Sequence, residues 1–152
     1  MITLDYAKIT DTVTRTLSVI GKRAADANGN SLYDVVTLGS NELPILHDYI
    51  RTAALAMLSA ASSLFRETSE SDDGISLVSC GGYSLHHRKD QLMRFAEGYA
   101  VAYSLARWLS IALPAQAELY AADAQQQLAR FAKLAKAPEI PHSIVSLNSV
   151  NK

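Results

Sequence analysis

The chain has 152 residues, of which 49% are hydrophobic and 19% charged, and this composition excludes wholesale disorder. Its 14 basic and 15 acidic residues give a formal net charge of -1, so the sequence has no electrostatic footprint for nucleic acid. The single cysteine, Cys80, excludes an intrachain disulfide, and no stretch resembles a signal peptide or approaches the ~20 apolar residues of a membrane span. We therefore expect a soluble protein made in a reducing cytoplasm.

The first half of the chain predicts two helices separated by a loop and a short connector. Apolar residues at steps of three and four predict a helix over 4–22, although its threonines lower the helix propensity. Glycine and asparagine predict a loop over 24–31, and residues 32–38 read as a short strand or an extended connector. A second helix, over about 44–65, is apolar over a wide arc, so we expect it to be the most buried helix.

The middle of the chain predicts a polar loop followed by a β-hairpin. Residues 66–74 are acidic and polar, which is typical of a solvent-exposed loop. Two runs that favour strands, 75–80 and 83–88, flank Gly81 and Gly82, and glycine permits the positive φ of a tight hairpin turn. We therefore expect a hairpin over about 75–88.

A pair of amphipathic helices is predicted over 90–137. Apolar residues recur at helical spacing on both sides of Pro114, which cannot continue a helix but suits the first turn of a new one. Asp90 is expected to cap the first of the two helices. Because the junction is short, we expect an antiparallel pair, and abundant alanine allows its axes to approach closely.

These elements predict a mainly α fold. We expect one four-helix bundle-like domain over 1–137 with one β-hairpin insertion, followed by an extended C-terminal arm over 138–152. The arm is too short for a domain and is interrupted by proline, yet it is apolar for a free chain end. We therefore expect it to dock on a neighbouring subunit.

No pattern of residues predicts catalysis, a cofactor or a metal site. His86 and His87 lie near Cys80, but adjacent residues of a strand point to opposite faces, and no CxxC or HxxxH spacing occurs. For the same reason His86 is badly placed to serve Cys80 as a general base. Residues 72–74 (Asp-Asp-Gly) lack the remaining ligands of a calcium loop. We expect a protein that is not an enzyme.

The run 97–131 resembles small helical virion proteins of tailed bacteriophages, namely head–tail connector (adaptor or neck) proteins, including those of phages of gut Bacteroidetes. In these proteins a helix that ends in a "WL…LP" segment is followed by a helix rich in Ala, Glu and Gln. The matching residues here are Trp108, Leu109, Leu113, Pro114, Tyr120 and Leu128. The resemblance implies a structural subunit of the virion that forms a ring, joins the portal to the tail and lines the DNA exit.

The implied partners are other copies of the chain in a homo-oligomeric ring, the portal and other neck or tail proteins. Proximity to DNA would be non-specific, and no membrane is involved. The alternative is a soluble bacterial helical module that binds or regulates a protein partner as a monomer or dimer, and a small cysteine enzyme is a third. The residues expected at interfaces are Tyr83, His86, Arg88, Trp108, Ile140, Ile144 and Val145.

Overall fold

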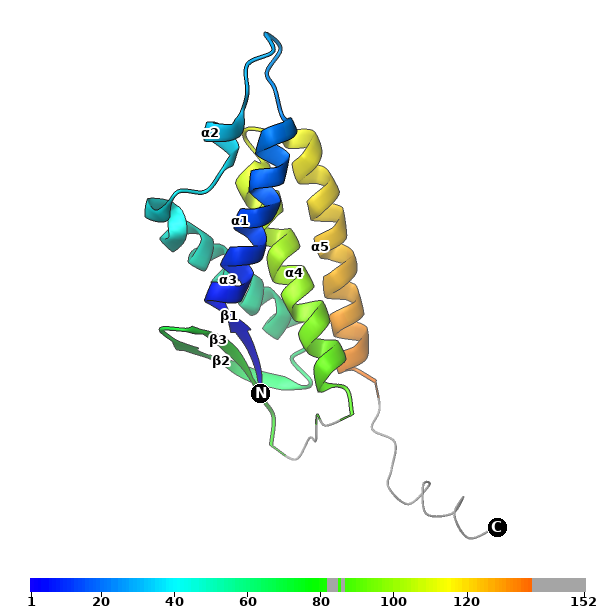
Figure 1. Cartoon of the computed structure of the whole chain (residues 1–152). Coiled ribbons are helices and arrows are strands. Elements are labelled where there is room, and N and C mark those ends of the chain that lie inside the picture. Colours follow the sequence, from blue (N-terminus) through cyan, green and yellow to red (C-terminus); the bar gives the residue numbers. More distant parts are fainter. Residues whose placement is uncertain (82–84, 86, 138–152) are drawn as a thin grey trace, which may run out of the picture.

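The structure is a computed structural model and describes residues 1–81, 85 and 87–137. It is mainly helical, with four long helices and a small antiparallel sheet of three strands (Figure 1). In chain order the elements are β1 (Ile2–Asp5), α1 (Tyr6–Arg23), α2 (Tyr33–Val36), the 3-10 helix η1 (Ser40–Glu42), α3 (Leu43–Ala60), β2 (Phe65–Ser71), β3 (Gly74–Ser79), α4 (Lys89–Leu109) and α5 (Pro114–Ala135).

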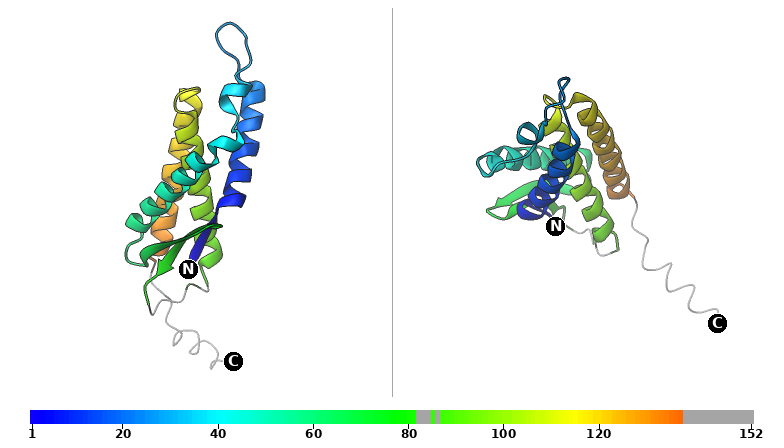
Figure 2. Two further views of the ribbon diagram at one scale, coloured as in Figure 1. Left: turned by 90° about the vertical axis from the view of Figure 1, so that its left-hand side faces the viewer. Right: turned by 45° about the horizontal axis from the view of Figure 1, so that its top comes forward.

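The predicted mainly α composition is confirmed, whereas the predicted four-helix bundle-like arrangement is not. Helices α1, α4 and α5 run alongside one another, whereas α3 crosses behind them at an angle (Figures 1 and 2). The sheet lies at the end of the molecule where α1 and α4 begin. Because α3 packs on β2 and β3 as well as on α4, the sheet and the helices share one apolar interior.

Helices α4 and α5 form the predicted antiparallel hairpin. Pro114 occupies the first turn of α5, as expected. The axes approach closely: a Cβ added to Gly98 of α4 would lie 3.1 Å from the side chain of Gln127 of α5. At the open end, Nη1 of Arg88 donates to the backbone oxygens of Leu134 and Ala137, at 2.9 and 2.6 Å. Arg88 thereby adds a side-chain donor to carbonyls at the end of α5, where the regular helical donors run out.

The sheet has the order β1-β3-β2, and both pairings are antiparallel. Its inner face consists of buried side chains that alternate with exposed ones, as the two-residue period of a strand requires. Gly74 is needed where β3 meets β1, because an added Cβ would lie 2.3 Å from the backbone oxygen of Leu4. The inner face is formed by Ile2, Leu4, Ile75 and Leu77.

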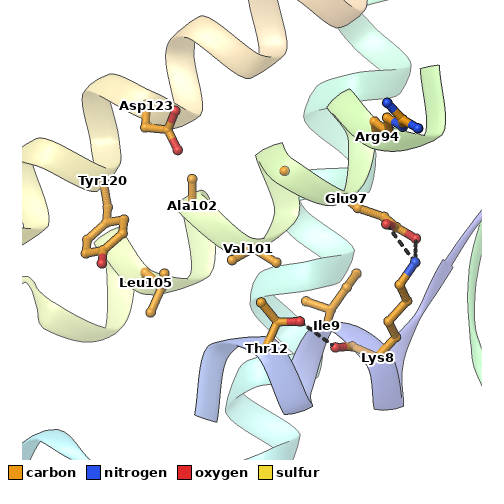
Figure 3. Close-up of a pocket in the computed structure, with 11 residues that line it drawn as sticks. Lys8, Ile9, Thr12, Arg94, Glu97, Val101, Ala102, Leu105, Tyr120 and Asp123 are labelled. Carbon is orange, nitrogen blue, oxygen red and sulfur yellow. Dashed lines mark hydrogen bonds and ion pairs between the residues drawn. The ribbon is translucent and has the colours of Figure 1, made fainter. Parts of the chain in front are cut away.

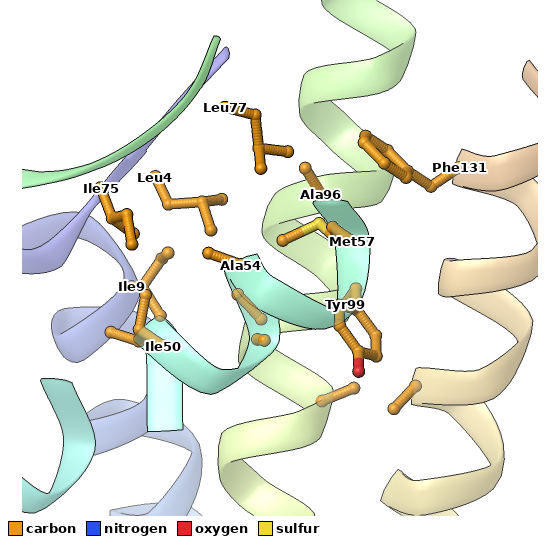
Figure 4. Close-up of a cluster of buried hydrophobic side chains, with 14 of the residues drawn as sticks. Leu4, Ile9, Ile50, Ala54, Met57, Ile75, Leu77, Ala96, Tyr99 and Phe131 are labelled. Carbon is orange, nitrogen blue, oxygen red and sulfur yellow. The ribbon is translucent and has the colours of Figure 1, made fainter. Parts of the chain in front are cut away.

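The core fills the space between this face, α3 and α4 (Figure 4). Met57 of α3 and Phe131 of α5 are fully buried, and Phe131 stacks on Phe65 with ring centroids 5.9 Å apart. Helix α4 contacts α1, α3, α5 and β1 and is the most buried helix. The prediction that the helix at 44–65 would be the most buried is therefore wrong, because α3 leaves the apolar side chains of Ile45 and Leu55 exposed.

The predicted hairpin was placed one strand too late. The hairpin in the structure joins β2 to β3 around residues 72–73, so the polar stretch 66–74 is mostly strand rather than loop. Strand β3 lies between β1 and β2, and both of its edges are paired. Of the second strand predicted over 83–88, residues 83, 84 and 86 lie outside the described residues, and residues 87 and 88 form a turn. Strand β2 is an edge strand that buries little besides Phe65, which explains its polar sequence.

Three local predictions also need correction. The helix predicted from residue 4 begins at Tyr6, because residues 2–5 are drawn into the sheet; Asp5 then caps α1 by accepting from the backbone N–H of Lys8 at 2.9 Å. The segment 32–38 contains the short helix α2 instead of a strand. Asp90 is not the N-cap of α4, since that helix begins one residue earlier and Asp90 lies in its first turn.

Candidate functional site

A groove runs between α1 and α5 over α4, and we call it the α1–α5 groove (Figure 3). It comprises two cavities of about 340 and about 680 Å³ that share Tyr120 as a lining residue. The lower cavity is lined by Lys8, Ile9, Thr12, Arg94, Glu97, Gly98, Val101, Ala102, Leu105, Tyr120 and Asp123. The upper cavity is lined by Thr16, Val19, Ile20, Arg23, Ala24, Ala25, Leu113, Gln116 and Tyr120.

The floor of the groove is apolar. Ile9 of α1 and Leu105 of α4 are buried at the bottom, and Val101 lies between them, half-buried (Figure 3). Higher in the groove, Val19 exposes 51% of its surface. An apolar floor that remains open to solvent is the usual character of a surface that binds another protein segment.

The rim of the groove carries charges of both signs. Nζ of Lys8 on α1 lies 2.7 and 2.8 Å from the two carboxylate oxygens of Glu97 on α4. Arg94 and Asp123 also line the rim, on α4 and α5. Because these charges are mixed and one pair is already matched, the groove does not favour a strongly charged ligand such as nucleic acid.

A second groove of about 560 Å³ lies on another face of the α4–α5 pair. Tyr99 and Tyr103 of α4 line it, with ring centroids 5.8 Å apart, and burial together with the neighbouring Tyr103 raises the pKa of Tyr99. Arg107 also lines it, and its guanidinium lies over the ring of Tyr49 of α3, 5.8 Å from the centroid. A neutral tyrosine is a hydrogen-bond donor and an apolar surface, not a base, so this groove also suits contact better than chemistry.

The most connected polar group in the described structure joins α1, α3 and β2, and we call it the Tyr6 cluster; it comprises Tyr6, His47, Asp48, Arg51 and Glu70. The Tyr6 hydroxyl donates to Glu70 at 2.7 Å, and its ring stacks on His47 with centroids 4.3 Å apart. Arg51 donates to both Glu70 and Asp48.

The pKa shifts within the Tyr6 cluster are those of residues that stabilise the fold. Burial, followed by the hydrogen bond to Glu70, raises the pKa of Tyr6 to about 12. The same hydrogen bond, together with that from Arg51, lowers the pKa of Glu70. A tyrosine held neutral and a carboxylate held ionised do not exchange a proton near neutral pH, so the hydrogen bond between Tyr6 and Glu70 acts as a structural contact there.

Two residues expected at interfaces make contacts within the chain. Trp108 Nε1 donates to the backbone oxygen of Val36 at 2.7 Å, which ties the connector after α1 to α4. Arg88 binds the end of α5 as described above. A role for either side chain between subunits stays a prediction. The other five expected interface residues, Tyr83, His86, Ile140, Ile144 and Val145, lie outside the described residues.

No sequence pattern predicted the α1–α5 groove, because the groove depends on how α1 packs against α4. A partial signal was present: Val101 is apolar yet lies off the main stripe of its helix, where a buried scaffold helix needs no apolar residue.

Cys80 is half-buried, and its backbone N–H donates to the oxygen of Leu64 at 2.8 Å.

Among the described residues, no three His, Cys, Asp or Glu side chains gather closely enough to hold a metal ion. None of the described helices is long and apolar enough to cross a membrane. Comparisons of the chain with models of protein families, with curated proteins and with solved structures found no match.

Proposed function

We propose that the chain is a structural subunit of a tailed-phage virion, a head–tail connector whose copies form a ring between portal and tail. The role requires neither catalysis nor a cofactor. The run 97–131, which resembles such connectors, coincides with most of α4 and α5. The observation that carries the proposal is the exposure of large apolar side chains on two helices that flank α4 on different sides.

These side chains are Leu55 on α3, which exposes 55% of its surface, and Leu119 on α5, which exposes 67%. Helices α3 and α5 extend to different sides of the molecule (Figure 2). Two different surfaces that bind each other join copies head to tail, and such a contact closes into a ring when the rotation per copy divides a full turn. A formal net charge of -1 adds little repulsion between copies.

The alternative is a helical module that binds a segment of another protein as a monomer or dimer. The α1–α5 groove favours it, because an apolar floor between two helix walls is the shape that receives a peptide or an amphipathic helix. The same groove could also bind a segment of a neighbouring copy in a ring. The two proposed functions therefore differ in the number of copies that assemble and not in the chemistry of the groove.

Native mass spectrometry and light scattering over a range of concentrations test the proposal, with and without a portal protein. We expect a large closed oligomer, alone or on addition of portal protein, and its loss in Leu55→Asp and in Leu119→Asp. Ser69→Asp, on the exposed part of edge strand β2, is the matched control and should assemble normally. A monomer or dimer that persists under all conditions would overturn the ring and leave the binding module.

A further inference from the structure

We infer that the α1–α5 groove of one copy receives residues 138–152 of the next copy. The inference rests on the proposed ring, because it names a second contact between adjacent subunits beside that of the surfaces around Leu55 and Leu119. It joins the open apolar groove to residues 138–152, which lie outside the described residues and are rich in aliphatic side chains.

The dimensions agree. From Lys8 to Arg23 the groove follows 15 helical steps of α1, or about 22 Å at 1.5 Å per residue. Beyond Ala137 the sequence continues for 15 residues, which reach at most about 50 Å when extended. The extended segment is therefore more than twice as long as the groove.

The chemistry agrees as well. The segment has one acidic and one basic side chain, Glu139 and Lys152, so it brings no strong charge to a rim whose own charges are mixed. Most of its other polar residues are serine and asparagine, which can hydrogen-bond to the rim without the desolvation cost of a charge. Its aliphatic side chains match the floor: Ile140, Ile144, Val145, Leu147 and Val150.

The position of the chain end favours a neighbouring copy over the chain's own groove. Gln127 of α5 packs against Gly98, which lines the lower cavity. The Ala137 carbonyl is held by Arg88 ten residues further along the chain, or about 15 Å beyond Gln127 if measured along a helix. To enter its own groove the chain would therefore have to reverse its direction after Ala137 and pass Gln127 again.

Two variants test the inserted segment and the groove separately. A chain ending at Ala137 keeps every described element and the carbonyl that Arg88 binds, but lacks the inserted segment. Thr12→Trp keeps the segment but places an indole in the groove from an exposed position on α1, so the core is untouched. Arg15→Trp, on the same helix but not among the groove residues, is the matched control. Circular dichroism melts establish that each variant is folded.

The test is native mass spectrometry of each variant alone and of the truncated and Thr12→Trp chains mixed in equal amounts. We expect each alone to remain monomeric and the mixture to give a heterodimer, since the truncated chain offers an empty groove and the other chain a free segment. Arg15→Trp should form the wild-type oligomer. Wild-type assembly by the truncated chain would overturn the inference while leaving the ring intact.

A synthetic peptide of residues 138–152, titrated into the truncated chain, gives a second readout through the methyl resonances of Val101 and Leu105. We expect saturable shifts, and at least tenfold weaker binding to the truncated chain that also carries Thr12→Trp. Absence of these shifts would overturn the inference. Peptide binding without a heterodimer in the mixture would also overturn it, because the segment would then occupy the groove of its own chain. A wild-type chain that never assembles would instead count against the proposed ring.

Discussion

Replacing Tyr6 by phenylalanine tests whether the Tyr6 cluster stabilises the junction of α1, α3 and β2. The change removes the hydroxyl that donates to Glu70 at 2.7 Å and keeps the buried ring that stacks on His47. A hydrogen bond to a charged group contributes about 1.5–3 kcal/mol, but Glu70 keeps Arg51 and its side chain is 41% exposed. We therefore expect Tyr6→Phe to lower the free energy of unfolding by about 1 kcal/mol, or Tm by about 3 °C.

The assay is urea unfolding followed by the fluorescence of Trp108, the only tryptophan of the sequence. Tyr33→Phe is the matched control, because Tyr33 is an exposed tyrosine on the short helix α2, and it should leave the midpoint unchanged. In a Glu70→Gln background, Tyr6→Phe should cost less than in the wild type, since the charged acceptor is already gone. Equal losses in both backgrounds would refute the assigned hydrogen bond.

The pH dependence gives an independent test, and its sign differs between the two groups. The pKa of Tyr6 is raised to about 12, so its contribution is complete below pH 10, the ordinary value, and is lost as the pH rises from there through about 12. The pKa of Glu70 is lowered, so its contribution is present above the ordinary value and is lost as the pH falls through the lowered one. Tyr6→Phe should therefore abolish this alkaline loss; an unchanged alkaline limb would contradict the reasoning.

Three further substitutions test other parts of the fold. Gly74→Ala should destabilise the protein by about 2–3 kcal/mol in urea unfolding, because its Cβ meets the Leu4 carbonyl in the neighbouring strand. Trp108→Phe should cost about 1–2 kcal/mol and speed amide exchange over 32–38, because the Val36 carbonyl loses its donor. Phe131→Ala should cost about 3–5 kcal/mol in thermal unfolding, because it empties a fully buried site.

The helices were predictable where local signals agreed. For α5, Pro114 marks the start, and apolar residues at helical spacing continue to its end. The helix-breaking proline and the helical spacing therefore predicted the same helix. At the N-terminus the signals conflicted: Leu4 falls in the helical period of α1, yet residues 2–5 also alternate. Four residues are too few for alternation to predict a strand. Residues 2–5 form a strand because they pair with β3, some seventy positions away in the sequence.

The sheet and the candidate sites could not be predicted because they depend on contacts between distant parts of the chain. Strand β2 looks like a loop because its charged residues face solvent at a sheet edge, and such an edge resists pairing with other chains. The Tyr6 cluster collects Tyr6, Arg51 and Glu70 from three elements. Each of these residues is unremarkable in its own local sequence, so no spacing rule could have joined them.

The residues of the α4–α5 hairpin are constrained to different degrees by its packing. Its alanines are required for close packing, so any tight hairpin of this length would share them, whatever its function. Leu119 and Val101 are not required for that packing, since the first is largely exposed and the second lines the α1–α5 groove. These are the positions at which a connector and a generic helical hairpin should differ. Leu119→Asp and Thr12→Trp therefore test function without disturbing the core, whereas substitutions at the buried alanines would report only on stability.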